Sequence, residues 1–167
     1  HGTHCAGTIA AVNNNGKGVS GVAGGSGKGD GCRIMSCQIF SGKRGGEVKE
    51  TVNAIKYAAD KGASIISCSF GYSKAFASDN AYVKAQGSAE IDVIHYFEAC
   101  KNNDVLNGNI AIFASGNEGH DYAHYPGAFN DIISVTAFGP DYLPTSYTNY
   151  GPGCNIAAPG GDSSLGA

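Results

Sequence analysis

Short hydrophobic runs recur along the chain, separated by longer stretches in which hydrophobic and polar positions alternate at helical spacing. The runs are too short for helices, they are rich in Ile, Phe and Ala, and turn-forming residues flank them. This is the pattern of buried strands. It predicts strands over residues 32–40, 63–70, 110–114, 132–138 and 155–158.

Two of the intervening stretches predict amphipathic helices. The first covers residues 47–61 and ends at Gly62; one face carries Val48, Val52, Ile55 and Ala59. The second begins at the capping residue Ser88, runs to about residue 102 and has Glu90 in its first turn, where the helix dipole favours an acid. Its hydrophobic stripe is Val93, Ile94, Phe97 and Cys100. The polar stretch 71–87 predicts a surface loop.

Strands that alternate with amphipathic helices predict an α/β fold, a three-layer α/β/α arrangement in which helices cover both faces of a mostly parallel sheet. In such sheets, ligands bind beyond the carboxyl ends of the strands. Ser69 and Asn117 each lie just after a predicted strand. We therefore expect the functional site at that edge of the sheet.

The composition limits the number of domains and the classes of partner. The chain has 167 residues, enough for one ordinary domain that buries about two thirds of its unfolded surface. Its 26 glycines and its charged content of 15% favour tight turns and close packing over a charged surface. A net charge of −3 argues against nucleic acid as a partner, and no hydrophobic run is long enough to span a membrane.

The six cysteines include no C-x-x-C pair. Four lie in or beside hydrophobic runs, where a thiol behaves as a small hydrophobic group: Cys32, Cys37, Cys68 and Cys154. We expect most of the six to be buried thiols, with disulfide pairing as the alternative that the sequence leaves open. Cys5 is expected close to His1.

Two residues have the chemistry for acyl transfer. His1 is followed by small residues at the start of a helical stretch and suits a general base, which takes a proton from a nucleophile and returns it to a leaving amine. Asn117 lies in a glycine-flanked turn, where its amide can donate toward an oxyanion. The alternatives are a structural histidine and an asparagine that only forms a turn. A zinc site at His1 and His4 lacks a carboxylate partner and the H-E-x-x-H spacing.

Five segments carry a family resemblance: residues 1–8 (HGTHCAGT), 67–71 (SCSFG), 114–119 (ASGNEG), 125–127 (YPG) and 157–160 (AAPG). Their order and spacing, over nearly the whole chain, resemble those of the subtilisin-like serine proteases (subtilases, peptidase family S8). The resemblance implies that His1 is the triad base and Asn117 the side-chain donor of the oxyanion hole. It implies a serine endopeptidase that cleaves extended polypeptides through an acyl-enzyme and needs no cofactor for catalysis.

The resemblance also assigns residues that contact the substrate. Two extended backbone segments would hold the peptide between them as an added strand: Ser69, Phe70 and Gly71, and Arg44, Gly45 and Gly46. A wall of the primary specificity pocket would be formed by Ala114, Ser115 and Gly116, with His124 near the base of that pocket. Polypeptide substrates are then the partners of a monomeric enzyme that is extracellular or at the cell surface.

Residues 12–19 resemble the calcium loop of the same family, in which carbonyl groups and one asparagine side chain supply oxygen ligands. Asn14 is the side-chain candidate. The loop is one residue longer than in the bacterial enzymes. An asparagine-rich turn without a metal is the alternative.

The family's nucleophile motif, Gly-Thr-Ser-Met-Ala, does not occur in the 167 residues, and the chain begins at the histidine itself. We therefore expect residues 1–167 to be part of a subtilisin-like catalytic domain that is inactive alone. Two other functions stay open. One is a noncatalytic subtilisin-fold module that binds peptides. The other is an α/β-hydrolase elbow at Ser73, with His95, His120 and His124 downstream.

Overall fold

The computed structural model describes residues 1–42 and 46–165. Within the chain two compact units are distinguished, His1–Cys37 and Gln38–Ala167.

The first unit is built on helix α1 (Gly2–Ala10), with His1 as its N-cap residue. The last carbonyl groups of a helix have no partner within the helix and need donors from elsewhere. Here the N–H groups of Val22 and Ala23 donate to the carbonyl oxygens of Thr8 and Ile9, at 2.9 and 2.8 Å. The loop that follows α1 is thereby joined to the end of the helix.

The predicted strand over residues 32–40 is wrong, because the structure assigns no strand to this segment. A strand exists only where a neighbouring strand accepts and donates backbone hydrogen bonds in register. Among the described residues, the start of this segment makes a backbone hydrogen bond from the N–H of Cys32 to the carbonyl of Ala23 (2.8 Å), and Ala23 is in no strand. Hydrophobicity alone therefore overestimated the strand content here.

The second unit contains a four-stranded sheet in the order β1-β2-β3-β4, formed by β1 (Ile65–Cys68), β2 (Ile110–Ala114), β3 (Ile133–Phe138) and β4 (Ile156–Pro159). All three pairs of neighbours are parallel, with Ile65 opposite Ile110, Ile112 opposite Ile133 and Val135 opposite Ile156. The other four predicted strands and their parallel arrangement are confirmed.

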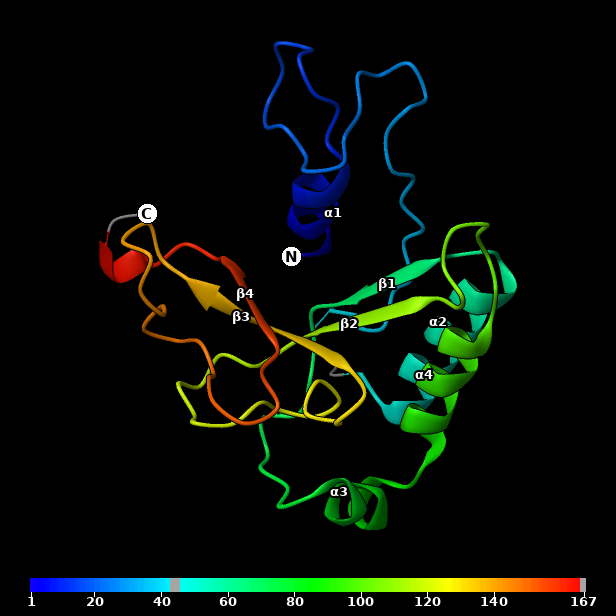
Figure 1. Ribbon diagram of the computed structural model, residues 1–167, viewed down its shortest axis with the longest axis vertical. Coiled ribbons are helices and arrows are strands. Elements are labelled where there is room, and N and C mark those ends of the chain that lie inside the picture. The colour runs from blue at the N-terminus through cyan, green and yellow to red at the C-terminus, as the bar shows by residue number, and fades with distance from the viewer. Residues whose placement is uncertain (43–45, 166–167) are drawn as a thin grey trace. The chain divides into compact units, whose positions relative to one another are not determined.

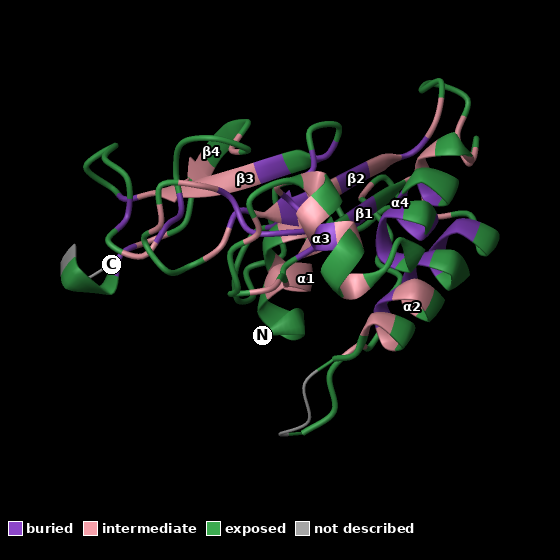
Figure 2. Ribbon diagram, turned by 90° about the horizontal axis from the view of Figure 1, so that it is seen from below, coloured by how far each residue is buried: buried purple, intermediate pink, exposed green. Residues whose placement is uncertain are grey.

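The two predicted helices are also confirmed, as α2 (Val48–Asp60) and α4 (Ala89–Ala99). They pack against one another, and α4 also packs on β2 (Figure 1). Their buried faces, visible in Figure 2, include Ile55, Ala58 and Ala59 of α2 and Ile91, Val93, Ile94 and Phe97 of α4. Ser88 is the N-cap residue of α4, although its hydroxyl makes no capping hydrogen bond. Cys100 lies just beyond the helix and is half-buried, so it is not part of the core stripe.

The predicted surface loop over residues 71–87 is wrong in its second half, which forms α3 (Asp79–Gln86). The hydroxyl of Ser78 caps this helix by accepting a hydrogen bond from the N–H of Ala81 (3.2 Å). Tyr82 is fully buried, and its ring stacks on that of Tyr125 at 4.8 Å between centroids. Its hydroxyl donates to the carboxyl group of Glu90. Burial raises the pKa of the Glu90 carboxyl group. This pair joins α3 to α4.

A short 3-10 helix, η1 (Ser163–Leu165), follows the sheet. The described residues form no disulfide. Of the six cysteines only Cys68 is buried, so the expectation that most are buried is wrong. None of the helices in the described part of the chain is long and apolar enough to cross a membrane.

Candidate active site

His1 lies at the N-terminus of α1 and is exposed to solvent. One helical turn brings residues four apart onto the same face. The Sγ atom of Cys5 accordingly lies 3.8 Å from Nε2 of His1, which confirms that the two side chains are neighbours. An exposed imidazole at a helix end is accessible to a substrate.

The carboxyl ends of β1 and β2 lie side by side because these strands are parallel, with Cys68 opposite Phe113. Ser69, Phe70 and Gly71 continue from β1, and residues 115–117 continue from β2. The ring of Phe70 packs edge-on against that of Phe113, at 5.6 Å between centroids. The sheet therefore brings together the two segments that the sequence singled out beyond these strands.

A third segment approaches Ser69–Gly71 through an aromatic contact. The Phe70 ring also packs edge-on against Phe40, at 6.3 Å between centroids. A Cβ atom at Gly46 would lie 3.1 Å from the same Phe40 ring. Gly46 and Phe70 thus both lie against Phe40. Arg44 and Gly45, the other members of the predicted substrate-binding segment, lie outside the described residues.

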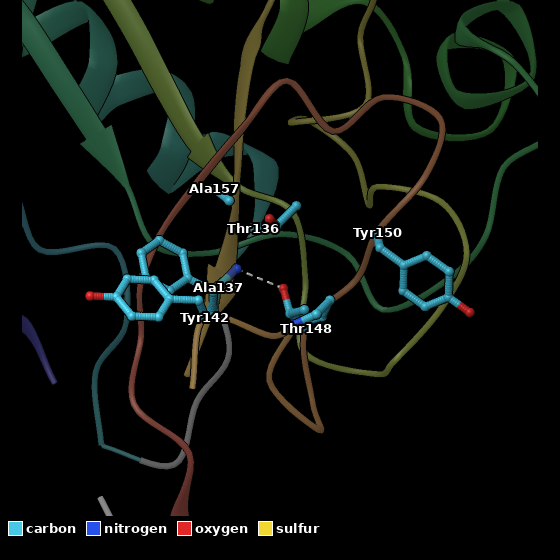
Figure 3. Close-up of a pocket in the computed structure, with 8 residues that line it drawn as sticks. Thr136, Ala137, Tyr142, Thr148, Tyr150 and Ala157 are labelled. Carbon is cyan, nitrogen blue, oxygen red and sulfur yellow. Dashed lines mark hydrogen bonds between the residues drawn. The ribbon is translucent and has the colours of Figure 1, made fainter. Parts of the chain in front are cut away.

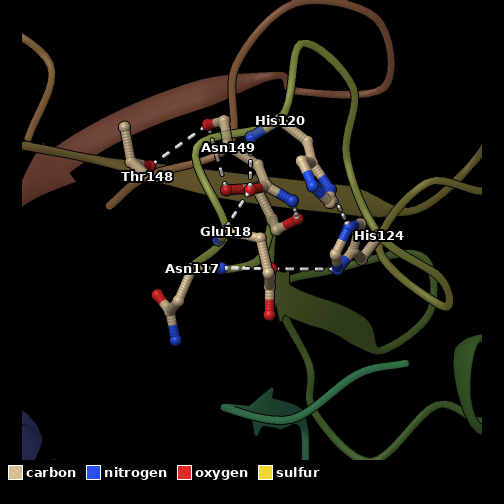
Figure 4. A network of polar contacts seen from close by, with 7 residues as sticks. Asn117, Glu118, His120, His124, Thr148 and Asn149 are labelled. Carbon is tan, nitrogen blue, oxygen red and sulfur yellow. Dashed lines mark hydrogen bonds and ion pairs between the residues drawn. The ribbon is translucent and has the colours of Figure 1, made fainter. Parts of the chain in front are cut away.

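The turn after β2 carries Asn117, and Figure 4 shows its side chain pointing away from the surrounding polar network. Asn117 is exposed, whereas Ser115 is buried and its N–H donates to the carbonyl of Val135 (3.0 Å). Gly116 has a φ of +117°, a backbone conformation that glycine adopts without a steric penalty. The N–H of Asn117 donates to Oε2 of Glu118 (2.7 Å). The turn is held through its backbone and leaves the Asn117 amide available to a ligand.

His124 is buried behind this turn, with 3% of its surface exposed. Its backbone N–H donates to the carbonyl of Ser115 (2.7 Å). In its ring, Nδ1 lies 3.1 Å from Oε2 of Glu118, and Nε2 lies 2.9 Å from Nδ1 of His120. Burial lowers the pKa of His124, the Glu118 carboxylate opposes this shift, and His120 adds to it. A neutral His124 that donates from Nδ1 to Glu118 and accepts at Nε2 satisfies both contacts.

Asn149 also belongs to this network, and no sequence motif points to it. It is fully buried, and its side chain bonds to the backbone of the Asn117 turn (Figure 4). It lies in a polar run between β3 and β4, where an asparagine is typical of a turn. No local pattern marks such a residue, because its partners are about thirty positions earlier in the chain.

Asn14, the predicted metal ligand, is exposed and has a left-handed backbone, with φ of 57°. The neighbouring Oδ1 atom of Asn13 is buried and has no hydrogen-bond partner among the described residues. In the described part of the chain, no group of three or more His, Cys, Asp or Glu side chains gathers as a metal site. Residues 12–19 contain no Asp or Glu, so the side-chain and carbonyl oxygen atoms that they offer are neutral.

The hydrolase elbow at Ser73 does not have the required geometry. In that motif the nucleophile lies in a sharp turn directly between a strand and a helix. Here β1 ends at Cys68, and the next helix, α3, begins only at Asp79. Of the downstream histidines, His95 pairs with Asp131 (2.8 Å), while His120 and His124 bond to one another.

A pocket of about 270 Å³ lies elsewhere in the second unit, over β3 and β4 (Figure 3). None of the predicted site residues lines it, and it contains no charged side chain. Its lining is Thr136, Ala137, Phe138, Tyr142, Pro144, Thr148, Tyr150 and Ala157. It lacks a general base, so it is not the candidate active site.

An exposed imidazole at a helix N-terminus, and a turn-borne amide at the carboxyl end of a parallel strand, are two of the elements that subtilisin-type acyl transfer requires. The family model of peptidase S8, the subtilase family, matches residues 1–167. The chain belongs to the subtilase family. Its parallel sheet and helices agree with an incomplete form of the three-layer α/β/α fold expected from the sequence.

The chain is similar to thermitase of Thermoactinomyces vulgaris, with 29% identity over 160 residues, covering 96% of this chain and 49% of the relative. It is 31% identical over 166 residues to the major intracellular serine protease of Bacillus subtilis, covering 96% of this chain and 44% of the relative. Among solved structures it resembles the patellamide maturation protease PatA, with a TM-score of 0.74 and 26% identity, covering 96% of this chain and 52% of that one. The chain thus spans about half the length of these relatives.

Proposed function

We propose that the full-length protein is a serine endopeptidase that cleaves extended polypeptides through an acyl-enzyme. The observation that carries this proposal is the exposed amide of Asn117, held on a backbone-anchored turn at the carboxyl end of β2 in a member of the subtilase family. A preorganised donor in this position stabilises the negative charge that develops on the carbonyl oxygen during acyl transfer.

In this proposal His1 is the general base. It takes the proton from the serine hydroxyl as that oxygen attacks the peptide carbonyl, and later returns it to the leaving amine. Asn117 donates to the oxyanion. The serine and the aspartate of the triad are supplied by other parts of the full-length protein, so residues 1–167 alone are not expected to hydrolyse peptides.

Substrate binding is assigned to backbone groups. Ser69–Gly71 and Arg44–Gly46 would hold an extended peptide between them as an added strand, in which main-chain hydrogen bonds supply affinity. The contact of Gly46 and Phe70 with the same Phe40 ring supports this pairing. Ala114, Ser115 and Gly116 would form a wall of the primary pocket. His124, with its side chain buried, would support that wall from behind.

The test is made on the full-length protein with a fluorophosphonate probe and a chromogenic peptide. We expect covalent labelling of one serine, and a fall in kcat of about 10²–10³-fold for Asn117→Ala. His1→Ala is expected to lower kcat by at least about 10²-fold. Ser73→Ala is the control and keeps full activity. Peptide binding without labelling by the probe would favour the noncatalytic module instead.

We further propose that residues 12–19 bind calcium in the full-length protein. Carbonyl and amide oxygens are suitable calcium ligands, and the unpartnered Oδ1 of Asn13 marks a loop with spare oxygen atoms. Asn14 would be the side-chain ligand, and a carboxylate would come from outside the loop. The ion would supply structural stability and take no part in catalysis.

The calcium proposal is tested by the apparent melting temperature of the inhibited full-length protein, in CaCl₂ and in EDTA. Calcium at a hundredfold excess over its dissociation constant stabilises the folded state by about 2.7 kcal/mol. We expect Asn14→Ala to abolish most of the difference between the two conditions. If the melting temperature of Asn14→Ala differed between CaCl₂ and EDTA by as much as that of the wild type, the assignment of Asn14 would be contradicted.

We also propose that the protein acts as a monomer outside the cell or at its surface. One matched relative, from Xanthomonas campestris, is named an extracellular protease. Labelling of medium, cell-surface and cytosolic fractions by the fluorophosphonate probe tests the location. Activity confined to the cytosol would contradict it.

A further inference from the structure

The side chain of Asn149 is fully buried and bonds to three backbone positions of the Asn117 turn. Its Oδ1 atom accepts hydrogen bonds from the N–H groups of Glu118 (3.0 Å) and His120 (3.1 Å). Its Nδ2 atom donates to the carbonyl of Ser115 (3.1 Å). The amide thus bonds to the turn on both sides of Asn117.

The backbone of Asn149 bonds to the same turn. Its N–H donates to the carbonyl of Gly116 (3.2 Å), and its carbonyl accepts a longer bond from the Ser115 hydroxyl (3.4 Å). The Thr148 hydroxyl also donates to this carbonyl (3.1 Å). A Cβ atom at position 116 would overlap Nδ2 of Asn149, so the approach of the two segments requires the glycine.

Asn117 is held differently. Its side chain is exposed and points away from the network, and its backbone N–H donates to the carboxylate of Glu118 (Figure 4). The position of its amide therefore follows from the backbone of residues 115–120, which Asn149 anchors. Anchors of this kind are needed because oxyanion stabilisation depends on donors placed about 2.7–3.1 Å from the developing charge.

We propose that Asn149 is a positioning residue of the oxyanion hole, acting through the backbone of the turn to set the place of the Asn117 amide. This inference rests on the proposed serine-protease function. Asn149 does not touch the substrate. Its loss weakens transition-state stabilisation more than binding of the ground state, since the displaced donor acts on the oxyanion.

The experiment is a double-mutant cycle in the full-length protein with a chromogenic peptide. We expect Asn149→Ala to lower kcat by about 10–10²-fold while KM stays within about twofold, the signature of an interaction made in the transition state. In an Asn117→Ala background the same substitution should lower kcat by less than about threefold. The two losses are then strongly non-additive, as for residues that act as a unit.

Asn102→Ala is the matched control. The Nδ2 atom of Asn102 also donates to backbone carbonyls, those of Ala59 (2.9 Å) and Ala63 (3.0 Å), and these belong to α2 and the residues after it. It should lower stability and keep kcat, because no part of the Asn117 turn depends on it. Asn149→Asp is a second variant of similar volume, which keeps an oxygen acceptor and loses the donor to Ser115; its kcat should also fall.

Amide hydrogen exchange gives a readout that does not depend on activity. We expect faster exchange at Glu118 and His120 in Asn149→Ala, and no change there in Asn102→Ala. An unchanged kcat, or an equal fall in kcat in both backgrounds, would overturn the positioning role while labelling by the fluorophosphonate leaves the protease function intact. A wild-type protein inert to the probe would overturn both.

Discussion

Histidine has the same intrinsic chemistry at each of its positions in this chain, and the environment of each side chain sets its role. His1 is exposed at the start of α1, whereas His124 has 3% of its surface exposed and bonds to Glu118 and His120. Burial lowers the pKa of His124, which keeps it neutral at neutral pH. A buried, hydrogen-bonded imidazole supports the turn after β2, and an exposed one is available for proton transfer.

The side chain of Asp162 is buried and hydrogen-bonded. Its carboxylate accepts hydrogen bonds from the N–H and the hydroxyl of both Ser146 and Ser164. These hydrogen bonds lower the pKa of Asp162 from 3.8 to about 2, and the bond from the Ser164 hydroxyl contributes most. The folded state thus favours the ionised form, so the stabilisation is complete above the unfolded-state pKa and is lost as the pH falls from about 4 toward 2.

We expect Asp162→Asn to lower the apparent melting temperature of the inhibited full-length protein at pH 7, with the difference from wild type shrinking toward pH 2. Asp104→Asn, at an exposed carboxylate, is the control and should follow the wild-type curve. A difference for Asp162→Asn that is the same at pH 7 and pH 2 would show that the carboxylate charge is not the cause.

Helix α1 depends on the loop that follows it. The helix itself buries no side chain, and its last carbonyls accept bonds from Val22 and Ala23. Gly24 makes this arrangement possible, because a Cβ atom there would overlap the carbonyl oxygen of Ala11. The element that carries His1 is thus stabilised by close backbone contact.

Gly24→Ala is therefore expected to destabilise the protein by about 1–3 kcal/mol or more, the usual range for overpacking. Because α1 carries His1, kcat should fall as well. Val22→Ala is the control: its side chain is exposed, and the hydrogen bond from its N–H is kept. Thermal unfolding and peptide hydrolysis by the full-length variants measure both effects. A melting temperature and a kcat equal to those of the wild type in Gly24→Ala would contradict the close approach of Gly24 to the carbonyl of Ala11.

The helix α3 shows how one element depends on a distant one. Its stretch of sequence is polar, yet Tyr82 is completely buried. The ring of Tyr82 contacts those of Tyr125 and Phe129, and its hydroxyl bonds to Glu90. Contacts with Tyr125 and Phe129, more than forty positions away, thus stabilise this segment as a packed helix, although its own pattern predicts an exposed loop.

The two faces of the sheet differ in burial. Residues directly opposite one another in register point to the same face, as do residues two apart in one strand. Register therefore places Ile65, Ile110, Ile112, Ile133, Val135 and Ile156 on one face. Ile65, Ile133 and Ile156 are 56%, 40% and 58% exposed, whereas Ile66, Ala111 and Phe113 on the other face are buried.

An exposed hydrophobic surface of this kind binds hydrophobic dyes and promotes association. Because the chain spans about half the length of its relatives, we expect further parts of the full-length protein to cover this face. Residues 1–167 alone should then bind the dye ANS more strongly than the full-length protein, and Ile156→Thr should reduce that binding. Equal dye fluorescence from both forms would count against a covered face.

Elements with a local hydrophobic pattern could be predicted from the amino-acid sequence. Periodicity located α2, α4 and four strands, and the rule for parallel sheets placed Ser69 and Asn117 at the same edge of the sheet, just beyond the strand ends. Five motifs were enough to identify the family. These features depend on residue spacing along the chain, which the sequence displays directly.

Which polar residues are buried, and which groups they bond to, depends on tertiary contacts that the sequence pattern does not show. Residues 32–40 include a hydrophobic run, yet none of the described residues pairs with them as a strand, and the polar stretch before Ser88 contains a helix that buries Tyr82. Asn149 anchors the turn that carries Asn117, although its own surroundings in sequence suggest an ordinary turn. Burial and hydrogen-bond partners come from segments far apart in the chain, whereas periodicity reports only on residues that are close together in sequence.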